Sequence, residues 1–197
     1  FCDSSKVDLI IPTATSAVRE AQNGPRFVEQ VERDIGLSLR VLDGEREAYY
    51  GVLGVLNEVP LTNGYVVDIG GGSAQVSEVR DRRFKQGQAF PLGALALTER
   101  FVSNPDAPIK PAELTAVRAE IQTHLNTLTW LNPLSGEQML VGLGGTLRNL
   151  ASMAAARQQY PLNTLHGFRL QRADLDESIE LLATQPLRKR QKFAGLS

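Results

Sequence analysis

The most informative stretch of this chain reads Val66-Val67-Asp68-Ile69-Gly70-Gly71-Gly72-Ser73-Ala74-Gln75-Val76-Ser77. An apolar run ends in a carboxylate, three glycines and a serine follow, and an alternating run then resumes. This order predicts a strand, a very tight turn and a second strand. Glycine adopts φ > 0 and lets another molecule approach the main chain, and successive exposed N–H groups form a concave anion site. We therefore expect a phosphate site made by Gly70, Gly71, Gly72 and Ser73. The alternative is a hairpin in which the glycines only make the bend.

Asp68 stands at the mouth of this turn. A carboxylate repels phosphate, but hard cations take carboxylate and phosphate oxygens together. Asp68 is therefore predicted to hold Mg²⁺ or a water molecule beside the phosphate.

Composition narrows the class of protein. The 197 residues suffice for one large or two small domains. Twenty-one basic and 22 acidic side chains leave a net charge of −1, so no overall field attracts nucleic acid or a membrane surface. One cysteine, Cys2, excludes a disulfide framework, and two distant histidines, His124 and His166, argue against a zinc site. No apolar run approaches the roughly 20 residues of a membrane span, and the start shows no signal-peptide pattern. The expectation is a cytoplasmic protein.

Strands and helices are expected to alternate in the first part of the chain. Apolar runs predict strands at 7–11 and 37–42. Helical spacing predicts helices at 26–35, ended by Gly36, and at 45–56. Such alternation indicates an α/β layer with parallel strands.

Hydroxyl side chains follow the first predicted strand, and a helix is expected to start near Ser16. Helix N-termini carry unpaired N–H groups, and Arg19, one turn further on, could fork onto a phosphate. The alternative is that Ser16 only caps the helix, while Arg19 is solvated or paired with Glu20 or another neighbour.

The predicted helix at 45–56 carries a second stripe beside its core-facing positions. Glu47, Gly51 and Gly54 fall at i, i+4 and i+7. Glycine inside a helix costs about 1 kcal/mol relative to alanine, which suggests that another part of the protein passes close by. Glu47 would then project into the gap as a general base. The alternative is a solvated glutamate that favours the first turn through the helix dipole.

Turn chemistry at 57–64 predicts a domain boundary, with a first domain at 1–57 and a second at 58–197. The second domain is expected to contain an antiparallel meander at 65–69, 74–80 and 83–90, with a turn at Asp81-Arg82. The other predicted elements are helices at 92–102, 112–131, 144–158 and 172–183 and strands at 139–143 and 165–170.

A second glycine-rich turn lies at 142–150, where a predicted strand leads into a helix. It matches neither the dinucleotide fingerprint nor a P-loop. Gly144, Gly145 and Thr146 are predicted to contact phosphate or ribose; the alternative is a helix start that needs a tight turn. The basic run 187–193 is either a solvated helix face or the lining of a channel for a polyanion.

These motifs together resemble the exopolyphosphatase / guanosine pentaphosphate phosphohydrolase (Ppx/GppA) family. The segments that carry the resemblance are 14–21, 43–48, 68–74, 142–148 and 165–170. Their order and spacing match, so the resemblance runs almost end to end. It implies an α/β chain with the actin-like ATPase fold, in which two RNase H-like domains enclose a cleft. This chain would supply part of domain I and most of domain II.

The resemblance also implies a phosphoanhydride hydrolase that acts with Mg²⁺ on the terminal phosphate of polyphosphate or of guanosine pentaphosphate. Glu47 matches the glutamate taken as the base that activates the attacking water, and Arg19 matches a phosphate-contacting arginine. Asp68 matches an aspartate assigned to metal or water, and the turn at 70–73 matches the second phosphate loop. Because phosphoryl transfer needs mainly positioning and charge neutralisation, these residue types suit the reaction. The family is often dimeric, so a homodimer is also an expectation.

The chain departs from the family pattern in two ways. Gln75 stands where the family's phosphate loop usually has an acidic residue, and nothing before Phe1 supplies an Asp-Leu-Gly-Ser-Asn-Ser type loop. The helices expected after 195–197 are also missing, so we expect a fragment with little or no turnover of its own. The rival function is a regulatory domain that binds polyphosphate or an alarmone without hydrolysing it, which Gln75 favours. An actin-fold kinase is a third interpretation, but it would need ATP loops that the chain matches only in part.

Overall fold

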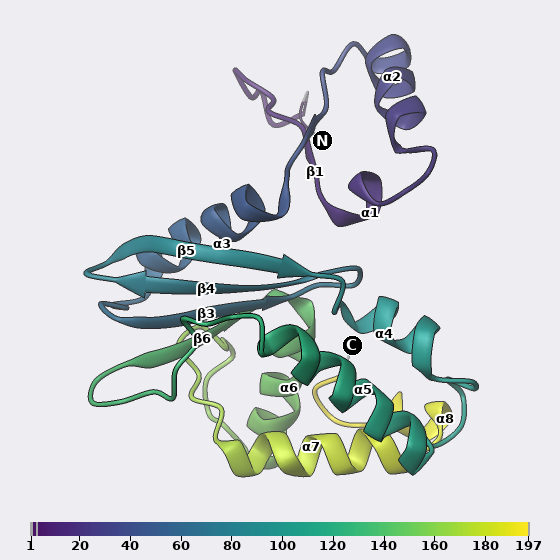
Figure 1. The fold of residues 1–197 in the computed structure, drawn as a ribbon, viewed down its shortest axis with the longest axis vertical. Coiled ribbons are helices and arrows are strands. Elements are labelled where there is room, and N and C mark those ends of the chain that lie inside the picture. The colour runs from purple at the N-terminus through teal and green to yellow at the C-terminus, as the bar shows by residue number, and fades with distance from the viewer. Residues whose placement is uncertain (1, 3, 197) are drawn as a thin grey trace.

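A four-stranded sheet forms the centre of the structure. The computed structural model describes residue 2 and residues 4–196. The strands are β3 (Gly64–Ile69), β4 (Ala74–Arg80), β5 (Arg83–Phe90) and β6 (Met139–Leu143). Their order is β5-β4-β3-β6; β3, β4 and β5 form antiparallel pairs, and β6 runs parallel to β3 (Figure 1). The predicted meander is confirmed, and its turn at Asp81-Arg82 uses left-handed φ values of 49° and 57°.

Helices enclose the sheet and build its two hydrophobic clusters. They are α3 (Gly44–Glu58), α4 (Ala94–Phe101), α5 (Pro111–Leu125), α6 (Gly144–Arg157), α7 (Arg172–Thr184) and α8 (Leu187–Arg190). On one face, Val52 of α3 packs with Val79 of β4, and both are fully buried. On the other face, Val76 of β4 belongs to a cluster with Leu128, which follows α5. A single strand supplies both clusters because successive side chains of a strand point to opposite faces.

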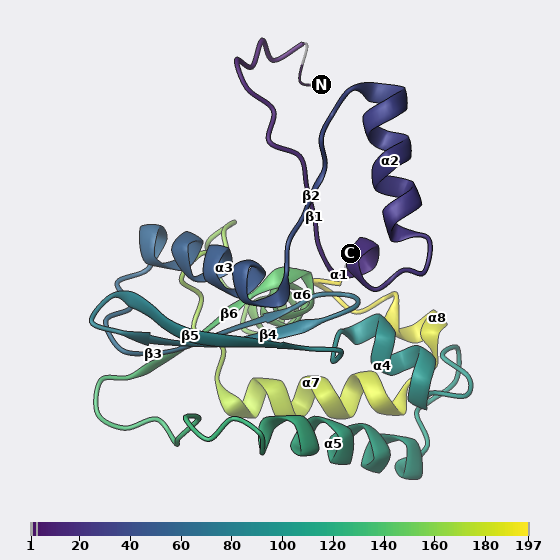
Figure 2. The same cartoon turned by 45° about the horizontal axis from the view of Figure 1, so that its top comes forward.

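The N-terminal segment stands away from the sheet (Figure 2). It contains β1 (Thr13–Ala14), α1 (Ser16–Arg19), α2 (Gly24–Ile35) and β2 (Arg40–Val41). The two short strands pair in the predicted parallel direction, but β1 lies outside the strand predicted at 7–11. Gly36 ends α2 with a left-handed φ of 73°, which also agrees with the sequence.

The strands predicted in this segment are wrong in extent. Residues 7–11 form no strand, and of 37–42 only Arg40–Val41 pairs. Leu9 is 73% exposed and Ile11 62% exposed. A strand needs a ladder partner, and the described residues place only a two-residue pair here. An apolar run alone therefore did not define these strands.

The strand predicted at 165–170 is also wrong. Here the Phe168 N–H donates to the Leu165 carbonyl at 3.0 Å, and Gly167 takes a left-handed φ of 71°. These features make a turn, which the apolar spacing of the segment did not reveal.

The helix predicted at 112–131 is shorter than expected, since α5 ends at Leu125. The Thr127 hydroxyl donates to the His124 carbonyl at 2.8 Å. It thereby satisfies one of the carbonyls that a helix leaves free at its C-terminus. The apolar period continues beyond this point because the following turn still packs Leu128 into the core.

The position of α3 bears on the predicted domain boundary. The boundary at 57–64 follows α3 in the sequence, yet α3 packs on the sheet formed by later residues. The division into domains at 1–57 and 58–197 therefore stays a prediction. Among the described residues, no helix has the length and apolar character that crossing a membrane would require.

Candidate functional site

Glu47 lies in the first turn of α3, and the local sequence explains why the helix begins there. Asp43 caps the helix, because its carboxylate accepts a hydrogen bond from the Arg46 N–H at 2.8 Å. Such a cap satisfies one of the free N–H groups at a helix start. Glu47 therefore stands near the positive end of the helix dipole.

Arg19, at the end of α1, holds the Glu47 carboxylate. Its Nη1 donates to Glu47 Oε2 at 3.1 Å and to the Leu42 carbonyl at 2.7 Å, while Nε donates to Glu20 Oε1 at 2.9 Å. The side chains of Arg19 and Glu47 are only 22% and 19% exposed. Burial alone would lower the pKa of Arg19, but its hydrogen bonds to Glu47 and Glu20 outweigh this effect and raise it. The guanidinium is therefore a fixed positive charge.

Asp68 supplies a second carboxylate near Glu47. It lies near the end of β3 and is partly buried. Burial raises the pKa of Asp68, and the negative charge of Glu47 raises it further. The charges of the two carboxylates therefore act on each other, and Arg19 lies beside Glu47.

Gly144 closes the space around Asp68. A Cβ atom at this position would lie 2.5 Å from Asp68 Oδ1 and 2.8 Å from the Ile69 carbonyl oxygen. Gly144 also has a left-handed φ of 87°. Both the close approach and the backbone conformation require glycine here. The sequence thus correctly indicated a tight turn at the start of α6.

The glycine turn between β3 and β4 is held by the start of α4. The Gly70 N–H donates to the Ser73 carbonyl at 3.0 Å, and the Gly70 carbonyl accepts from the Ala94 N–H at 2.9 Å. Within the described part of the chain, the N–H groups of Gly71 and Gly72 meet no acceptor, and both residues are exposed. The turn therefore presents free N–H groups on a fixed backbone, as an anion site requires.

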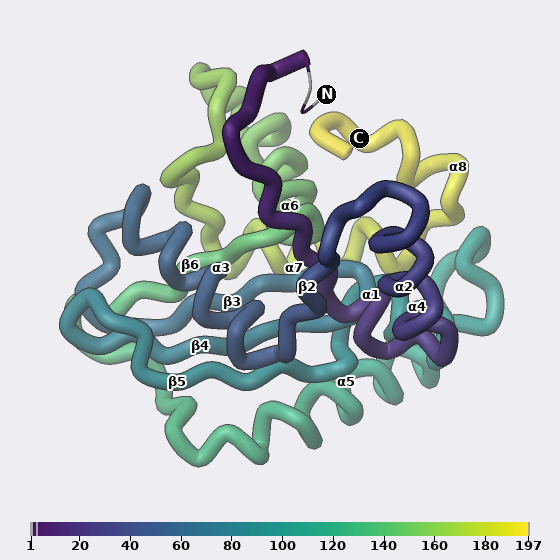
Figure 3. The backbone as a smooth tube through the Cα atoms, turned by 90° about the horizontal axis from the view of Figure 1, so that it is seen from above, coloured from purple at the N-terminus to yellow at the C-terminus, as the bar shows by residue number. Residues whose placement is uncertain are grey.

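The N-terminal segment meets this turn. A Cβ atom on Gly72 would lie 2.9 Å from Ser16 Oγ, so the start of α1 is packed against the glycine turn. Figure 3, seen from above, shows α1 over the end of the sheet where α4 begins. The structure thus brings Arg19, Glu47, Asp68 and the glycine turn to one end of the sheet.

The remaining predicted phosphate ligands lie next to this group. Gly145 is exposed and Thr146 is half-buried, and both belong to the first turn of α6, directly after Gly144. Their backbone N–H groups lie at the N-terminus of a long helix, where anions are favoured.

Two features of the site could not be identified from the sequence. One is the Leu42 carbonyl, which anchors Arg19 through a contact between residues 23 positions apart. The other is Gly93, where a Cβ atom would lie 2.2 Å from the Gly71 carbonyl oxygen. The only sequence signal for Gly93 is a glycine directly before a helix.

A divalent cation at Asp68 stays a prediction. The described residues contain no group of three or more His, Cys, Asp or Glu side chains arranged to hold a metal ion. Mg²⁺, however, is usually bound through one or two carboxylates together with substrate phosphates. Asp68 supplies one such carboxylate, and the charge of Glu47 acts on it.

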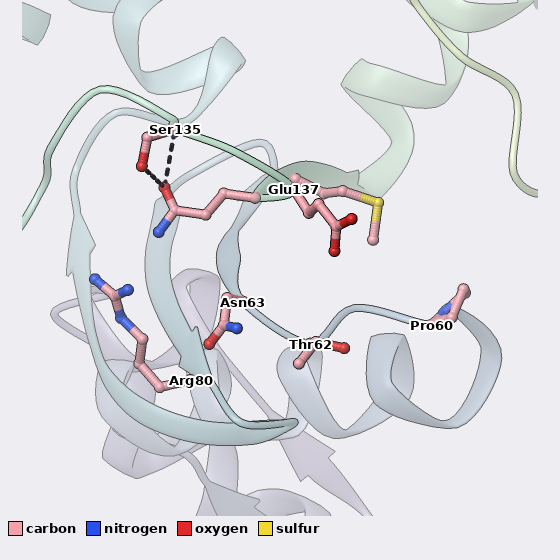
Figure 4. A pocket seen from close by; sticks show the side chains of 8 residues that line it. Pro60, Thr62, Asn63, Arg80, Ser135 and Glu137 are labelled. Atoms are coloured by element: carbon pink, nitrogen blue, oxygen red, sulfur yellow. Dashed lines mark hydrogen bonds between the residues drawn. The ribbon is translucent and has the colours of Figure 1, made fainter.

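A cavity of about 440 Å³ lies elsewhere, where β3 and β6 begin (Figure 4). Its lining consists of Pro60, Thr62, Asn63, Arg80, Ser135, Glu137, Gln138 and Met139. Arg80 is already engaged, since its Nε donates to the buried Glu78 carboxylate at 2.8 Å. Asp68 lies toward the opposite end of β3, so this cavity is separate from the candidate site.

The basic run at 187–193 forms α8 and the turn after it. Arg190 donates to the carbonyls of Pro105 and Ala107, which ties α8 to the loop before α5. Arg188 and Lys189 are exposed. A solvated helix face accounts for them, and a channel for a polyanion stays a prediction.

Comparison with known proteins bears on these observations. The model of the Ppx/GppA phosphatase family matches residues 1–197. The chain belongs to the Ppx/GppA phosphatase family. The resemblance to the Ppx/GppA family is thereby confirmed over the whole chain.

Relatives within the Ppx/GppA family include exopolyphosphatases. Exopolyphosphatase 1 of Mycobacterium tuberculosis is 32% identical over 147 residues, which cover 73% of this chain and 42% of that protein. Exopolyphosphatase 2 of the same organism is 28% identical over 193 residues, which cover 93% of this chain and 59% of that protein. The chain thus spans about half the length of these relatives.

Solved Ppx/GppA structures share the fold. The Aquifex aeolicus family member superimposes with a TM-score of 0.79 at 27% identity, covering 100% of this chain and 62% of that one. An exopolyphosphatase from Cytophaga hutchinsonii gives a TM-score of 0.79 at 26% identity, covering 98% and 63%. The predicted α/β fold is confirmed, and the solved Ppx/GppA structures share it.

Proposed function

We propose that this chain supplies the catalytic carboxylates and two phosphate-binding turns of a phosphoanhydride hydrolase. Its substrate is the terminal phosphate of inorganic polyphosphate or of guanosine pentaphosphate. The observation that carries the proposal is the group of Arg19, Glu47 and Asp68 beside the exposed N–H groups of the turn at 70–73. Membership of the Ppx/GppA family and the exopolyphosphatase relatives support it.

Glu47 is the general base. It takes a proton from the attacking water, whose oxygen forms a bond to the terminal phosphorus while the bridging phosphorus–oxygen bond breaks. The products are inorganic phosphate and the shortened chain. Arg19 holds the Glu47 carboxylate through Nη1, and its Nη2 makes no hydrogen bond within the described residues, so it can donate to a phosphate oxygen.

The two turns hold the phosphate from different elements. The N–H groups of Gly71 and Gly72 and the Ser73 hydroxyl receive oxygens on one side. The start of α6, at 144–146, offers helix N-terminal N–H groups on the other. When bound at Asp68, Mg²⁺ would neutralise phosphate charge that the protein alone leaves uncompensated.

The test is phosphate release by the parent protein, the full-length protein of which we propose this chain to be a part. Glu47→Gln should lower release from long-chain polyphosphate or guanosine pentaphosphate by about 100-fold or more, the usual contribution of a general base. Glu45→Gln is the matched control, because Glu45 lies exposed in the same helical turn. It should retain nearly full activity. Equal losses in the two variants would refute the role of Glu47.

The second candidate function is a regulatory domain that binds the same anions without hydrolysis. The neutral Gln75, in β4 directly after the phosphate turn, favours it. Tight binding of polyphosphate by the parent protein with no phosphate release would establish this alternative. The 197-residue chain on its own should release little or no phosphate, and robust Mg²⁺-dependent release from it would contradict that expectation.

A further inference from the structure

Gln75 and Ser73 form a buried hydrogen bond beside the candidate site. Gln75 Nε2 donates to Ser73 Oγ at 2.9 Å, and the two residues are only 3% and 6% exposed. Gln75 also lies directly opposite Asp68 in the register of β3 and β4, so their side chains share a face of the sheet. Gln75 therefore links the serine of the phosphate turn to the face that carries Asp68.

The amide donor decides what the Ser73 hydroxyl can do. A hydroxyl has one proton to donate and two lone pairs, whereas an ionised carboxylate can only accept hydrogen bonds. Because Gln75 donates, it occupies a lone pair of Ser73 and leaves the proton unused. Within the described part of the chain, that proton has no acceptor. It is available to an acceptor that binds at the glycine turn.

We propose that Gln75 is a positioning residue, which holds the Ser73 hydroxyl so that its proton is donated to a phosphate oxygen. The inference rests on the proposed function, in which the turn at 70–73 receives the terminal phosphate. A carboxylate at position 75 would draw the Ser73 proton inward and add negative charge opposite Asp68.

A double-mutant cycle in the parent protein tests this coupling. Gln75→Glu and Gln75→Met are each made with Ser73 present and with Ser73→Ala, and KM and kcat for long-chain polyphosphate are measured. Loss of one hydrogen bond to a charged oxygen predicts a KM about 10-fold higher for Ser73→Ala. Gln75→Glu should raise KM by at least as much when Ser73 is present, and clearly less when Ser73 is alanine. Gln75→Met removes the donor without adding charge, so it should give a smaller effect that disappears in Ser73→Ala.

The cycle separates the coupling between Gln75 and Ser73 from the effect of the negative charge that Gln75→Glu adds. That charge alone should change KM by the same factor with Ser73 present and with Ser73→Ala. Gln88→Glu is the matched control, since Gln88 lies exposed on the neighbouring β5. Its KM should stay within about 2-fold of the wild-type value. Thermal melting confirms that each variant folds, and Gln75→Met carries the test if Gln75→Glu does not.

The outcomes also separate this inference from the proposed function. If the wild-type protein releases phosphate but both Gln75 variants raise KM by the same factor in both backgrounds, the inference is overturned and the hydrolase stands. If the wild-type protein releases none, the same cycle is measured on the Kd for inorganic phosphate. If the Gln75 substitutions change this Kd less in Ser73→Ala than with Ser73 present, the positioning role of Gln75 holds in a binding domain. If they change it by the same factor in both backgrounds, that role is overturned.

Discussion

Arg19 Nη1 donates a hydrogen bond to Glu47 Oε2 at 3.1 Å, and this contact joins α1 to the first turn of α3. The same nitrogen is anchored on the Leu42 carbonyl, directly before the capping residue Asp43. The arginine thus fixes both the carboxylate and the start of the helix that carries it.

Replacing Arg19 should therefore affect stability as well as activity. Arg19→Met removes hydrogen bonds to a charged group and should lower the free energy of unfolding by about 1.5–3 kcal/mol. Glu20→Gln is the control, because Glu20 is 72% exposed and an exposed pair contributes about 0–1 kcal/mol. Urea denaturation of both variants checks the difference. Similar losses would mean that Arg19 is held by its exposed partner instead of by Glu47.

We expect substitution of Gly144 by alanine to destabilise the protein, whereas the same substitution of Gly145 should be tolerated. Gly144→Ala places a Cβ atom 2.5 Å from Asp68 Oδ1 at a φ of 87°, so we expect a loss of about 1–3 kcal/mol or more. Gly145→Ala meets nothing within 4 Å and should keep or slightly increase stability. The melting temperatures of the two variants decide this. A Gly144→Ala variant as stable as the wild type would show that the turn against Asp68 is loose.

Gly93 should matter for the phosphate turn although it lies outside it. A methyl group there would lie 2.2 Å from the Gly71 carbonyl oxygen, and backbone atoms must shift to relieve the contact. Gly93→Ala should therefore displace the turn and lower phosphate release by the parent protein about 10-fold or more, since small misplacements are costly in catalysis. The rates of phosphate release by Gly93→Ala and by the wild-type parent protein are compared, and equal rates would contradict the prediction.

Gly54 tests the hypothesis that another part of the protein passes close to α3. In this chain a Cβ atom on Gly51 would lie 3.5 Å from Leu143 Cδ1, whereas a Cβ atom on Gly54 would meet nothing within 4 Å. Gly54→Ala should therefore stabilise the isolated chain by about 0.5–1 kcal/mol through helix propensity. The same substitution should destabilise the parent protein if a further segment packs there. Stabilisation in both would refute the hypothesis.

The lowered pKa of Glu113, at the start of α5, predicts that the stability of the fold depends on pH. Its hydrogen bond from the Ser103 hydroxyl, with further bonds from the N–H groups of Lys110 and Ser103, lowers the pKa of Glu113 from 4.5 to about 2. The unfolded chain then binds more protons than the folded one between these values, so stability falls as pH falls from about 4.5 to about 2. Glu113→Gln should lie below the wild type at pH 7 and approach it toward pH 2. Ser103→Ala should show part of the same convergence, and parallel curves would contradict the prediction.

Several elements could be predicted because local spacing specifies them. The meander follows from alternating apolar residues around the Asp81-Arg82 turn, and α2 follows from a helical period ended by Gly36. The wrong strands at 7–11 and 165–170 share one cause. An apolar run becomes a strand only where another strand offers a ladder, and spacing alone carries no information on that partner.

By itself, the sequence determined the fold class, the family, and which carboxylates and glycines follow strands or begin helices. These properties depend on residue order over short distances. Tertiary structure alone decided that Arg19 reaches Glu47 and the Leu42 carbonyl, that Asp68 lies near Glu47, and that Gln75 donates to Ser73 inside the sheet. The reason is that such contacts depend on strand register and on how α1 and α3 pack against the sheet, and residues distant in the chain set both.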